Sequence, residues 1–223
     1  MPVGIASMPI ALIANEVDLG TTALILSVVF LIMFIAGLSL YWLIPLITVG
    51  MGAIIYAATH IHERAGRLMA FLNPEQYRLA EGLQQWQALI AFGSGGMSGL
   101  GLGEGRQKYS YLPYAHTDFI FAIIGEELGL IATLTVIFCY LLIFLCGLLI
   151  AFNAKDHFGN LLGCGLTLLI TLQAMINIGV AISLLPNKGM PLPFISYGGS
   201  NLAICLFMIG ILLNIYRMGY PLS

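Results

Sequence analysis

Charged side chains are scarce in this chain, and that scarcity limits what it can be. Of its 223 residues only 8% are Asp, Glu, Lys or Arg, whereas 60% are hydrophobic. Soluble domains average about 25% charged residues, so this composition excludes an ordinary water-soluble protein. The formal net charge is only −2 and no strongly basic tract is present, so nothing indicates binding to nucleic acid. The sequence therefore predicts a protein embedded in a membrane.

Cysteine is also scarce, and its spacing excludes the common cysteine-based sites. The four cysteines lie inside apolar runs, without a C-x-x-C pair or a nearby histidine: Cys139, Cys146, Cys164 and Cys205. We interpret them as small residues of the core. The sequence assigns no metal site and predicts no cofactor. Whether a divalent cation takes part is left open.

Long uncharged runs predict an all-α, polytopic bundle of transmembrane helices. Residues 19–59 contain no charged side chain, and one helix of that length would measure about 60 Å, twice the thickness of the hydrocarbon core. We therefore expect a reversal near Gly37 to Tyr41. The apolar stretches predict one membrane domain over 1–223, with a partial span at 2–15 and five complete spans at 21–38, 41–59, 118–150, 161–186 and 196–216.

The one long polar segment, residues 60–117, is predicted to be a large external loop. It holds five of the eight basic residues. Asn73 followed by Pro74 is typical of a helix start. The apolar residues Leu79, Leu83, Trp86 and Ile90 follow at helical spacing, which predicts an amphipathic helix that ends at Gly93. The glycine-rich run at 93–105 matches no nucleotide-binding loop, and we interpret it as a hinge that lets the backbone approach a ligand.

Basic residues in the short loops predict the orientation. Lys155 lies between two spans and Arg217 follows the last one, so the positive-inside rule places both in the cytoplasm. The loops 60–117 and 186–197 are then external. A basic external loop predicts an anionic partner such as lipid phosphates.

Three carboxylates interrupt the apolar segment 115–129, where an unpaired charge is costly. If 118–150 is one helix, Asp118 lies at its outer end, and Glu126 and Glu127 lie about 12–13 Å deeper. Ala122, Gly125 and Gly129 would share the face of Asp118. This stripe of small residues predicts close helix packing and an open space below Asp118 for a lipid chain.

The residues alone leave the roles of these carboxylates open. Asp118 is either an N-terminal helix cap or a partner of the helix dipole, or else a catalytic or binding group, with neither favoured. For Glu126 and Glu127, structural pairing is favoured over proton transfer, with Gln173 and Asn177 on a later span as the expected partners.

Several motifs resemble a known family. "YLPYAHTDFIFAIIGEELGL" at 111–130, "KGMPLPFISYGGSNL" at 188–202 and "NEVDLGTT" at 15–22 are similar to signature segments of the SEDS proteins (shape, elongation, division and sporulation), the FtsW/RodA/SpoVE group. The second of these motifs is most similar to the FtsW branch. The resemblance covers essentially the whole chain and corresponds to the C-terminal half of a family whose members have about ten spans.

The resemblance implies a peptidoglycan glycosyltransferase that polymerises lipid II during cell division or cell-wall growth. It implies a multi-pass protein of the bacterial cytoplasmic membrane with its active site on the outer face. The implied partners are membrane lipid, a class B penicillin-binding protein transpeptidase and proteins of the divisome or elongation complex. The family's Glu/Lys motif lies before the part that this chain matches, so we expect the chain alone to be inactive.

The same resemblance assigns site residues. Asp118 matches the proposed catalytic Asp, which would accept the proton of the attacking sugar hydroxyl. Cations would offset charge on the departing pyrophosphate. The candidate substrate-binding residues are Arg64, Arg67, Gln107, Lys108, His116, Lys188, Ser196, Tyr197 and Ser200.

Two other classes of function remain as alternatives. In a lipid flippase or transporter, Glu126 and Glu127 would form a proton relay. A non-catalytic membrane interaction subunit is the third hypothesis. The concentration of basic and glycine residues in 60–117 favours the enzyme.

Overall fold

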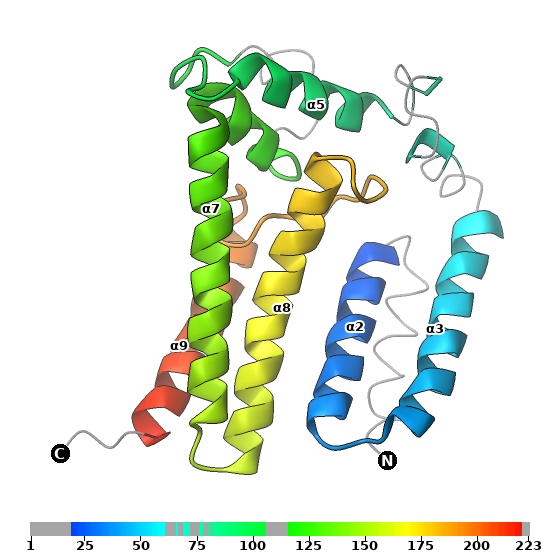
Figure 1. The fold of residues 1–223 in the computed structure, drawn as a ribbon, viewed down its shortest axis with the longest axis vertical. Coiled ribbons are helices and arrows are strands. Elements are labelled where there is room, and N and C mark those ends of the chain that lie inside the picture. The colour runs from blue at the N-terminus through cyan, green and yellow to red at the C-terminus, as the bar shows by residue number, and fades with distance from the viewer. Residues whose placement is uncertain are drawn as a thin grey trace.

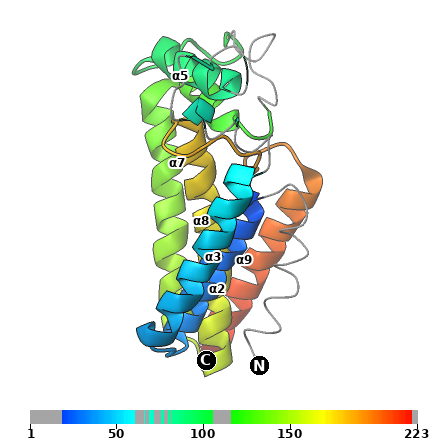
Figure 2. The same cartoon turned by 90° about the vertical axis from the view of Figure 1, so that its right-hand side faces the viewer.

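The computed structural model describes residues 19–60, 66, 69–71, 76–77, 80, 82–105 and 116–219. Its elements in this part of the chain are helices: α2 (Leu19–Ile35), α3 (Leu40–His60), α5 (Leu83–Gly95), α7 (Ile120–Phe152), α8 (His157–Ala181) and α9 (Gly199–Gly219). Most run along the long axis of the molecule, while α5 lies across one end (Figures 1 and 2). The predicted all-α bundle is confirmed.

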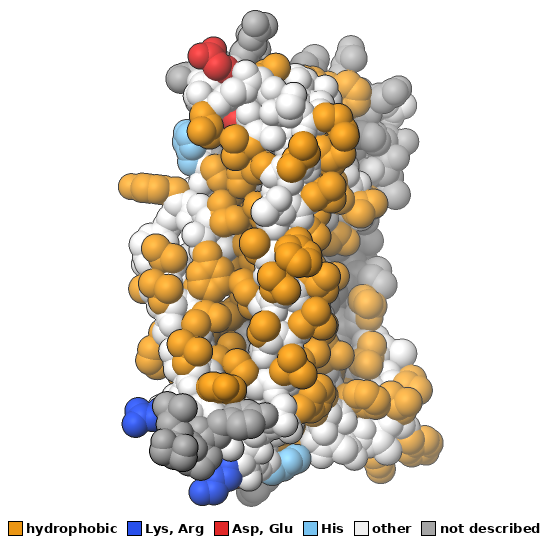
Figure 3. Space-filling view, turned by 60° about the vertical axis from the view of Figure 1, so that its left-hand side comes forward, with side chains coloured by type: hydrophobic (Ala, Val, Ile, Leu, Met, Phe, Trp, Pro, Cys, Tyr) orange, Lys and Arg blue, Asp and Glu red, His pale blue; other side chains and the backbone are white. Residues whose placement is uncertain are grey.

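Helix length and composition make this a multi-pass membrane protein. Among the described helices, α7, α8 and α9 are each long and apolar enough to cross a bilayer. The helices α2 and α3 are apolar as well and contain no charged residue. Figure 3 shows hydrophobic side chains covering the flank of the molecule, while the charged side chains visible in this view lie at its two ends. This is the surface that a lipid bilayer requires.

The predicted reversal between the first two complete spans is confirmed. Gly37 has a φ of +92°, a conformation that glycine adopts without strain. Its N–H bonds to Phe34 O, and Leu38 N bonds to Met33 O, both at 3.0 Å. These bonds satisfy the last carbonyls of α2 in the manner of a glycine C-cap, and α3 begins three residues later.

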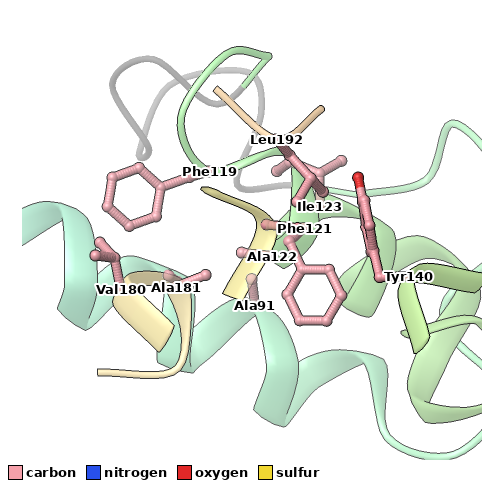
Figure 4. Close-up of a cluster of buried hydrophobic side chains, with 11 residues drawn as sticks. Ala91, Phe119, Phe121, Ala122, Ile123, Tyr140, Val180, Ala181 and Leu192 are labelled. Atoms are coloured by element: carbon pink, nitrogen blue, oxygen red, sulfur yellow. The ribbon is translucent and has the colours of Figure 1, made fainter. Parts of the chain in front are cut away.

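The prediction of one continuous helix over 118–150 is wrong, because the chain reverses inside α7. Gly129 has φ +76° and ψ −170°, far from helical values. Phe121 and Tyr140 belong to one buried cluster and lie side by side in Figure 4. On a straight helix they would be about 28 Å apart at 1.5 Å per residue. Residues 120–128 therefore form a short arm that runs back beside the long arm, residues 130–152 (Figure 1).

This reversal inverts the predicted depth of the carboxylates. The turn at Gly129 lies beside the C-terminal end of α5, since Leu130 N donates to Gly96 O at 3.0 Å. Glu126 and Glu127 precede it directly, so they lie near that end, and Asp118 lies at the far end of the short arm. The prediction that the two glutamates lie deeper than Asp118 is wrong, because depth depends on the direction of the arm.

The glycine-rich run stabilises the reversal. Leu100 N and Gly101 N donate to Glu126 O and Glu127 O at 3.0 and 2.9 Å, and Leu130 N donates to Gly96 O at 3.0 Å. At Gly99, whose φ is +78°, a Cβ would collide with the backbone of 127–129. The sequence predicts that the glycine-rich run brings its backbone close to a ligand. In the part of the run that the structure describes, the backbone comes close to α7 instead.

The amphipathic helix of the long loop differs in its bounds and its buried face. Asn73 lies outside the described residues, and α5 begins only at Leu83 and continues past Gly93 to Gly95. The predicted apolar stripe includes Ile90, which is exposed. The buried face consists of Gln85, Ala88, Ala91 and Gly95.

Helix α5 packs against small residues on the short arm of α7. Ala122 is fully buried, and a Cβ at Gly125 would collide with the ring of Phe92. The predicted packing role of this stripe is confirmed. The predicted open space for a lipid chain along it is wrong, because Phe92 occupies it.

The bundle arranges its loops as the charge pattern predicted. The described part of the 60–117 loop and the segment after α8 lie at one end, which we call the α5 end. The turn between α7 and α8 lies at the other, the Lys155 end (Figure 1). Of the cysteines, Cys164 and Cys205 are buried, while Cys139 and Cys146 are exposed on α7, so the prediction of core positions is wrong for those two.

Candidate active site

The turn before α7 is bonded to a distant part of the chain through three consecutive carbonyls. The donors come from α8 and from the segment that follows it. The pairs are Tyr197 N to His116 O at 3.0 Å, Ser196 Oγ to Thr117 O, and Asn177 Nδ2 to Asp118 O at 2.7 Å. The backbone of Asp118 is thereby fixed against residues that are far away in sequence.

Asn177 is the central donor of this arrangement. Its Nδ2 also donates to Met190 O at 2.6 Å, and its side chain is only 1% exposed. One helical turn earlier on α8, Gln173 Nε2 donates to Pro191 O at 2.9 Å. The sequence predicts that these two carboxamides, Gln173 and Asn177, pair with Glu126 and Glu127. That prediction is wrong, because the chain reversal brings the 188–191 segment and Asp118 to this face of α8.

The carboxylate of Asp118 faces the same segment. A Cβ at Gly189 would lie 2.8 Å from Asp118 Oδ2, so glycine permits this close approach. The N-cap of α7 is Phe119, without a side-chain capping bond, so the interpretation of Asp118 as a helix cap is wrong. Nothing in the sequence signalled the role of Gly189 beyond its place in a motif.

The half-buried position of Asp118 makes its carboxylate a stronger base. Burial raises its pKa above the ordinary 3.8, and a hydrogen bond from the Thr117 side chain opposes this with a smaller effect. Asp118 lies in the turn that precedes the membrane-spanning helix. A carboxylate with a raised pKa holds a proton more strongly, as a general base requires.

Lys188 brings a cation to the neighbourhood and adds a third segment. Its alkyl chain lies over the start of α2, since a Cβ at Gly20 would be 2.5 Å from Lys188 Cε. It is followed directly by Gly189, which contacts Asp118. The start of α2, the turn before α7 and the segment after α8 therefore meet at one place.

The segment after α8 is irregular but firmly held. Ser196 Oγ accepts from Leu192 N at 2.6 Å, and Tyr140 donates its hydroxyl proton to Pro193 O. Phe194 has a φ of +67°, which is strained for an aromatic residue. The hydroxyl of Ser196 is buried and used inside the protein, so its contact with substrate stays a prediction.

The remaining predicted substrate-binding residues lie at the rim or outside the described chain. His116, Tyr197 and Ser200 are exposed, Tyr197 by 84%. The side chains outside the described residues are Arg64, Arg67, Gln107 and Lys108. The structure thus brings Asp118, Lys188 and Ser196 together at one site.

Glu126 and Glu127 lie against the glycine-rich loop. Gly103 N donates to Glu127 Oε2 at 3.0 Å, and Glu126 is 1% exposed. A Cβ at Gly105 would lie within 3.0 Å of an oxygen of each carboxylate. These contacts favour the structural role over a proton relay. Within the described ranges no group of three His, Cys, Asp or Glu could hold a metal ion.

The sequence motifs that meet at this site are those of one family. The family model for FtsW, RodA and SpoVE, described as "Cell cycle protein", matches residues 1–220. The chain belongs to this family. The two motifs that contain Asp118 and Lys188 are separated by 70 positions in this sequence, and the fold brings them together.

Curated members of the family support the assignment. The chain is 43% identical over 206 residues to the probable peptidoglycan glycosyltransferase FtsW of Trichlorobacter lovleyi, covering 92% of this chain and 54% of that protein. It is 38% identical over 214 residues to the stage V sporulation protein E of Bacillus subtilis, covering 96% and 58%. The chain therefore spans about half the length of the curated relatives it matches.

Solved structures agree with the fold. A chain in a peptidoglycan synthase complex matches with a TM-score of 0.78 at 24% identity, covering 99% of this chain and 62% of that one. A variant of the rod shape determining protein RodA from Thermus thermophilus matches with a TM-score of 0.66 at 25% identity, covering 98% and 56%.

Proposed function

We propose that this chain carries the acceptor-activating half of a peptidoglycan glycosyltransferase that polymerises lipid II. The observation that carries the proposal is the half-buried carboxylate of Asp118, which lies against Gly189. Gly189 directly follows Lys188 in the sequence. Relatives that are 38–43% identical to it over 206–214 aligned residues bear the names probable peptidoglycan glycosyltransferase FtsW and stage V sporulation protein E.

The reaction joins a sugar hydroxyl of one molecule to the anomeric carbon of another. Asp118 accepts the hydroxyl proton as the new C–O bond forms, and the bond to undecaprenyl pyrophosphate breaks. Negative charge grows on the departing pyrophosphate, and Lys188 would help to offset it. Arg64, Arg67 and Lys108 would add to this cationic surface, and His116, Tyr197, Ser200 and Gln107 would contact the sugars.

The site would face outward from the bacterial cytoplasmic membrane. Lys155 and Arg217 lie at the end opposite the site, and the positive-inside rule assigns that end to the cytoplasm. Lipid II polymerisation uses the outer face. The likeness to a chain from a peptidoglycan synthase complex supports a class B penicillin-binding protein as a partner.

The test replaces Asp118 in a protein that supplies all spans of the family. A chimera would join this chain to the part of the Trichlorobacter lovleyi relative that it does not cover, and would be reconstituted with lipid II and a class B penicillin-binding protein. Asp118→Asn should lower polymerisation by about 10² or more, the scale of general-base catalysis. The unmodified chain alone should be inactive.

Glu127→Gln is the matched control. Like Asp118→Asn, it replaces a partly buried carboxylate by the corresponding amide, and Glu127 lies on α7. The Gln side chain retains an oxygen to accept from Gly103 N, so the rate per folded molecule should change little. Polymerisation by Asp118→Asn at the parental rate, with equal protein abundance, would disprove the proposed base.

A further inference from the structure

A hollow of about 560 Å³ lies between α8 and α9 at the Lys155 end of the bundle, away from Asp118. Its volume is typical of sites that hold a small molecule. Its polar lining residues are Lys155 and Asp156, which directly precede α8, and Asn214, which lies in α9 somewhat more than one turn before its end. Apolar residues line both the outer end, where Phe158 and Met218 lie, and the part that extends along the two helices, where Leu162, Ile211 and Phe207 lie.

Gly210 of α9 is one of the residues that line the hollow. A Cβ at Gly210 would meet no atom within 4 Å, so the space above it is empty. The walls are large side chains, and Phe158 and Phe207 are 71% and 70% exposed. Aromatic rings that are this exposed on apolar helices are suited to contact with hydrocarbon, so we infer that the hollow opens toward the lipid.

The dimensions of the hollow match one leaflet of a bilayer. Phe207 and Met218 both line it, and they are separated by about 16 Å along α9 at 1.5 Å per residue. Half of the hydrocarbon core is about 15 Å thick. Lys155 and Asp156 lie at the end of the helices, where headgroups lie, whereas Leu162, Ile211 and Phe207 lie at the depth of acyl chains.

The charges at the mouth favour an anion. Lys155 is exposed at the rim, and Arg217 lies in the last turn of α9 at the same end. Asp156 is the opposing charge. Its carboxylate is the N-cap of α8 and accepts from Gly159 N at 3.4 Å, so it is directed to the helix start, where the dipole offsets its charge.

We propose that this hollow binds one phospholipid with an anionic headgroup from the leaflet at the Lys155 end. Lys155 contacts the phosphate, Asn214 contacts the polar headgroup region, and an acyl chain lies over Gly210 between Leu162 and Phe207. Basic pockets between membrane helices bind such headgroups. This site does not depend on the proposed glycosyltransferase activity, because it lies at the opposite end of the bundle.

Native mass spectrometry of the purified chain tests the proposal directly. The chain in detergent would be titrated with phosphatidylglycerol and with phosphatidylcholine of identical acyl chains. We expect one retained phosphatidylglycerol per chain and weaker retention of phosphatidylcholine. Gly210→Leu should weaken phosphatidylglycerol binding by about tenfold or more, because the new side chain fills the hollow.

Two further variants separate the headgroup from the acyl chain and from general effects. Lys155→Ala should lower phosphatidylglycerol affinity by about fivefold and leave phosphatidylcholine unchanged, and its exposed position makes misfolding no concern. Gly52→Leu on α3 is the matched control, since a Cβ at Gly52 also meets no atom within 4 Å. It should bind phosphatidylglycerol like the parent chain.

Three results would overturn the proposal. The first is equal retention of the two lipids, and the second is unchanged binding by both Gly210→Leu and Lys155→Ala. The third is a dimer of the chain that Gly210→Leu converts to a monomer, which would identify the hollow as an interface between two copies.

Discussion

Asn177 Nδ2 bonds simultaneously to Asp118 O at 2.7 Å and to Met190 O at 2.6 Å. One buried amide thus joins the turn that carries the proposed base to the segment that carries the proposed cation. Asn177 Oδ1 has no hydrogen-bond partner among the described residues, so the NH₂ group makes the bonds that are observed here. The relationship gives Asn177 a positioning role that can be tested.

Asn177→Ala should slow polymerisation in the reconstituted chimera. Two buried carbonyls would lose their donor, which costs about 1–3 kcal/mol of stability for each group left unpaired. The turn at Asp118 would also lose its fixed geometry, so kcat should fall more than KM rises. Thermal unfolding and polymerisation rate per folded molecule measure the two effects.

Asn160→Ala is the control for that experiment. Asn160 Nδ2 donates to Ala151 O at 3.0 Å at the opposite end of the bundle, so its loss should lower stability without changing the rate of the folded enzyme. If Asn177→Ala behaves in the same way, Asn177 serves the fold alone.

The raised pKa of Asp118 predicts the pH dependence of the reaction. The base acts only when it is ionised, so the rate should fall as pH decreases through a pKa above the ordinary 3.8 of Asp. A pH–rate profile of the chimera should show this acid limb. The limb should be absent from the residual activity of Asp118→Asn, and its persistence there would assign it to another group.

The same burial predicts a stability change of known sign. Because the folded-state pKa is raised, the contribution of Asp118 to stability is greatest below its unfolded pKa and is lost as pH rises through the folded pKa. Asp118→Asn should therefore unfold at a higher temperature than the parent at pH 7. The difference should disappear below pH 3.8, where both forms are neutral. A lower unfolding temperature at pH 7 would contradict the inferred cost of burial.

Gly129→Ala should destabilise the fold strongly. Its φ of +76° with ψ −170° is a conformation that essentially only glycine adopts, and a Cβ would lie 2.6 Å from Met97 O. We expect a loss of about 3 kcal/mol or more. Gly93→Ala on α5 meets no neighbour and should stabilise the helix by about 0.5–1 kcal/mol. Thermal unfolding in detergent distinguishes them, and equal midpoints would argue against the reversal at Gly129.

Single cysteines should report the sidedness of the two ends. In a background without the four native cysteines, Tyr197→Cys should react with a membrane-impermeant thiol reagent added outside intact cells, because Tyr197 is 84% exposed at the α5 end. Lys155→Cys should react only after the membrane is permeabilised. Labelling of Lys155→Cys in intact cells would reverse the proposed orientation.

The sequence by itself determined the membrane class, the main spans and the family. Hydrocarbon tolerates few charges, so uncharged runs locate helices such as α2 and α3, and Gly37 between them is a local turn signal. The motifs around Asp118 and Lys188 identify the family without any geometry. These features depend on which residues are neighbours in the sequence, so they can be recognised without the tertiary structure.

Only the tertiary structure decided the direction of the arm that carries Asp118. A glycine in an apolar run is compatible with both a continuous helix and a reversal, and Gly129 reverses because the 96–101 backbone packs against it. The partners of Asn177 follow from that reversal. A buried amide must find some hydrogen-bond partner, but which carbonyl it meets depends on the neighbouring segment, and packing between segments distant in sequence selects it.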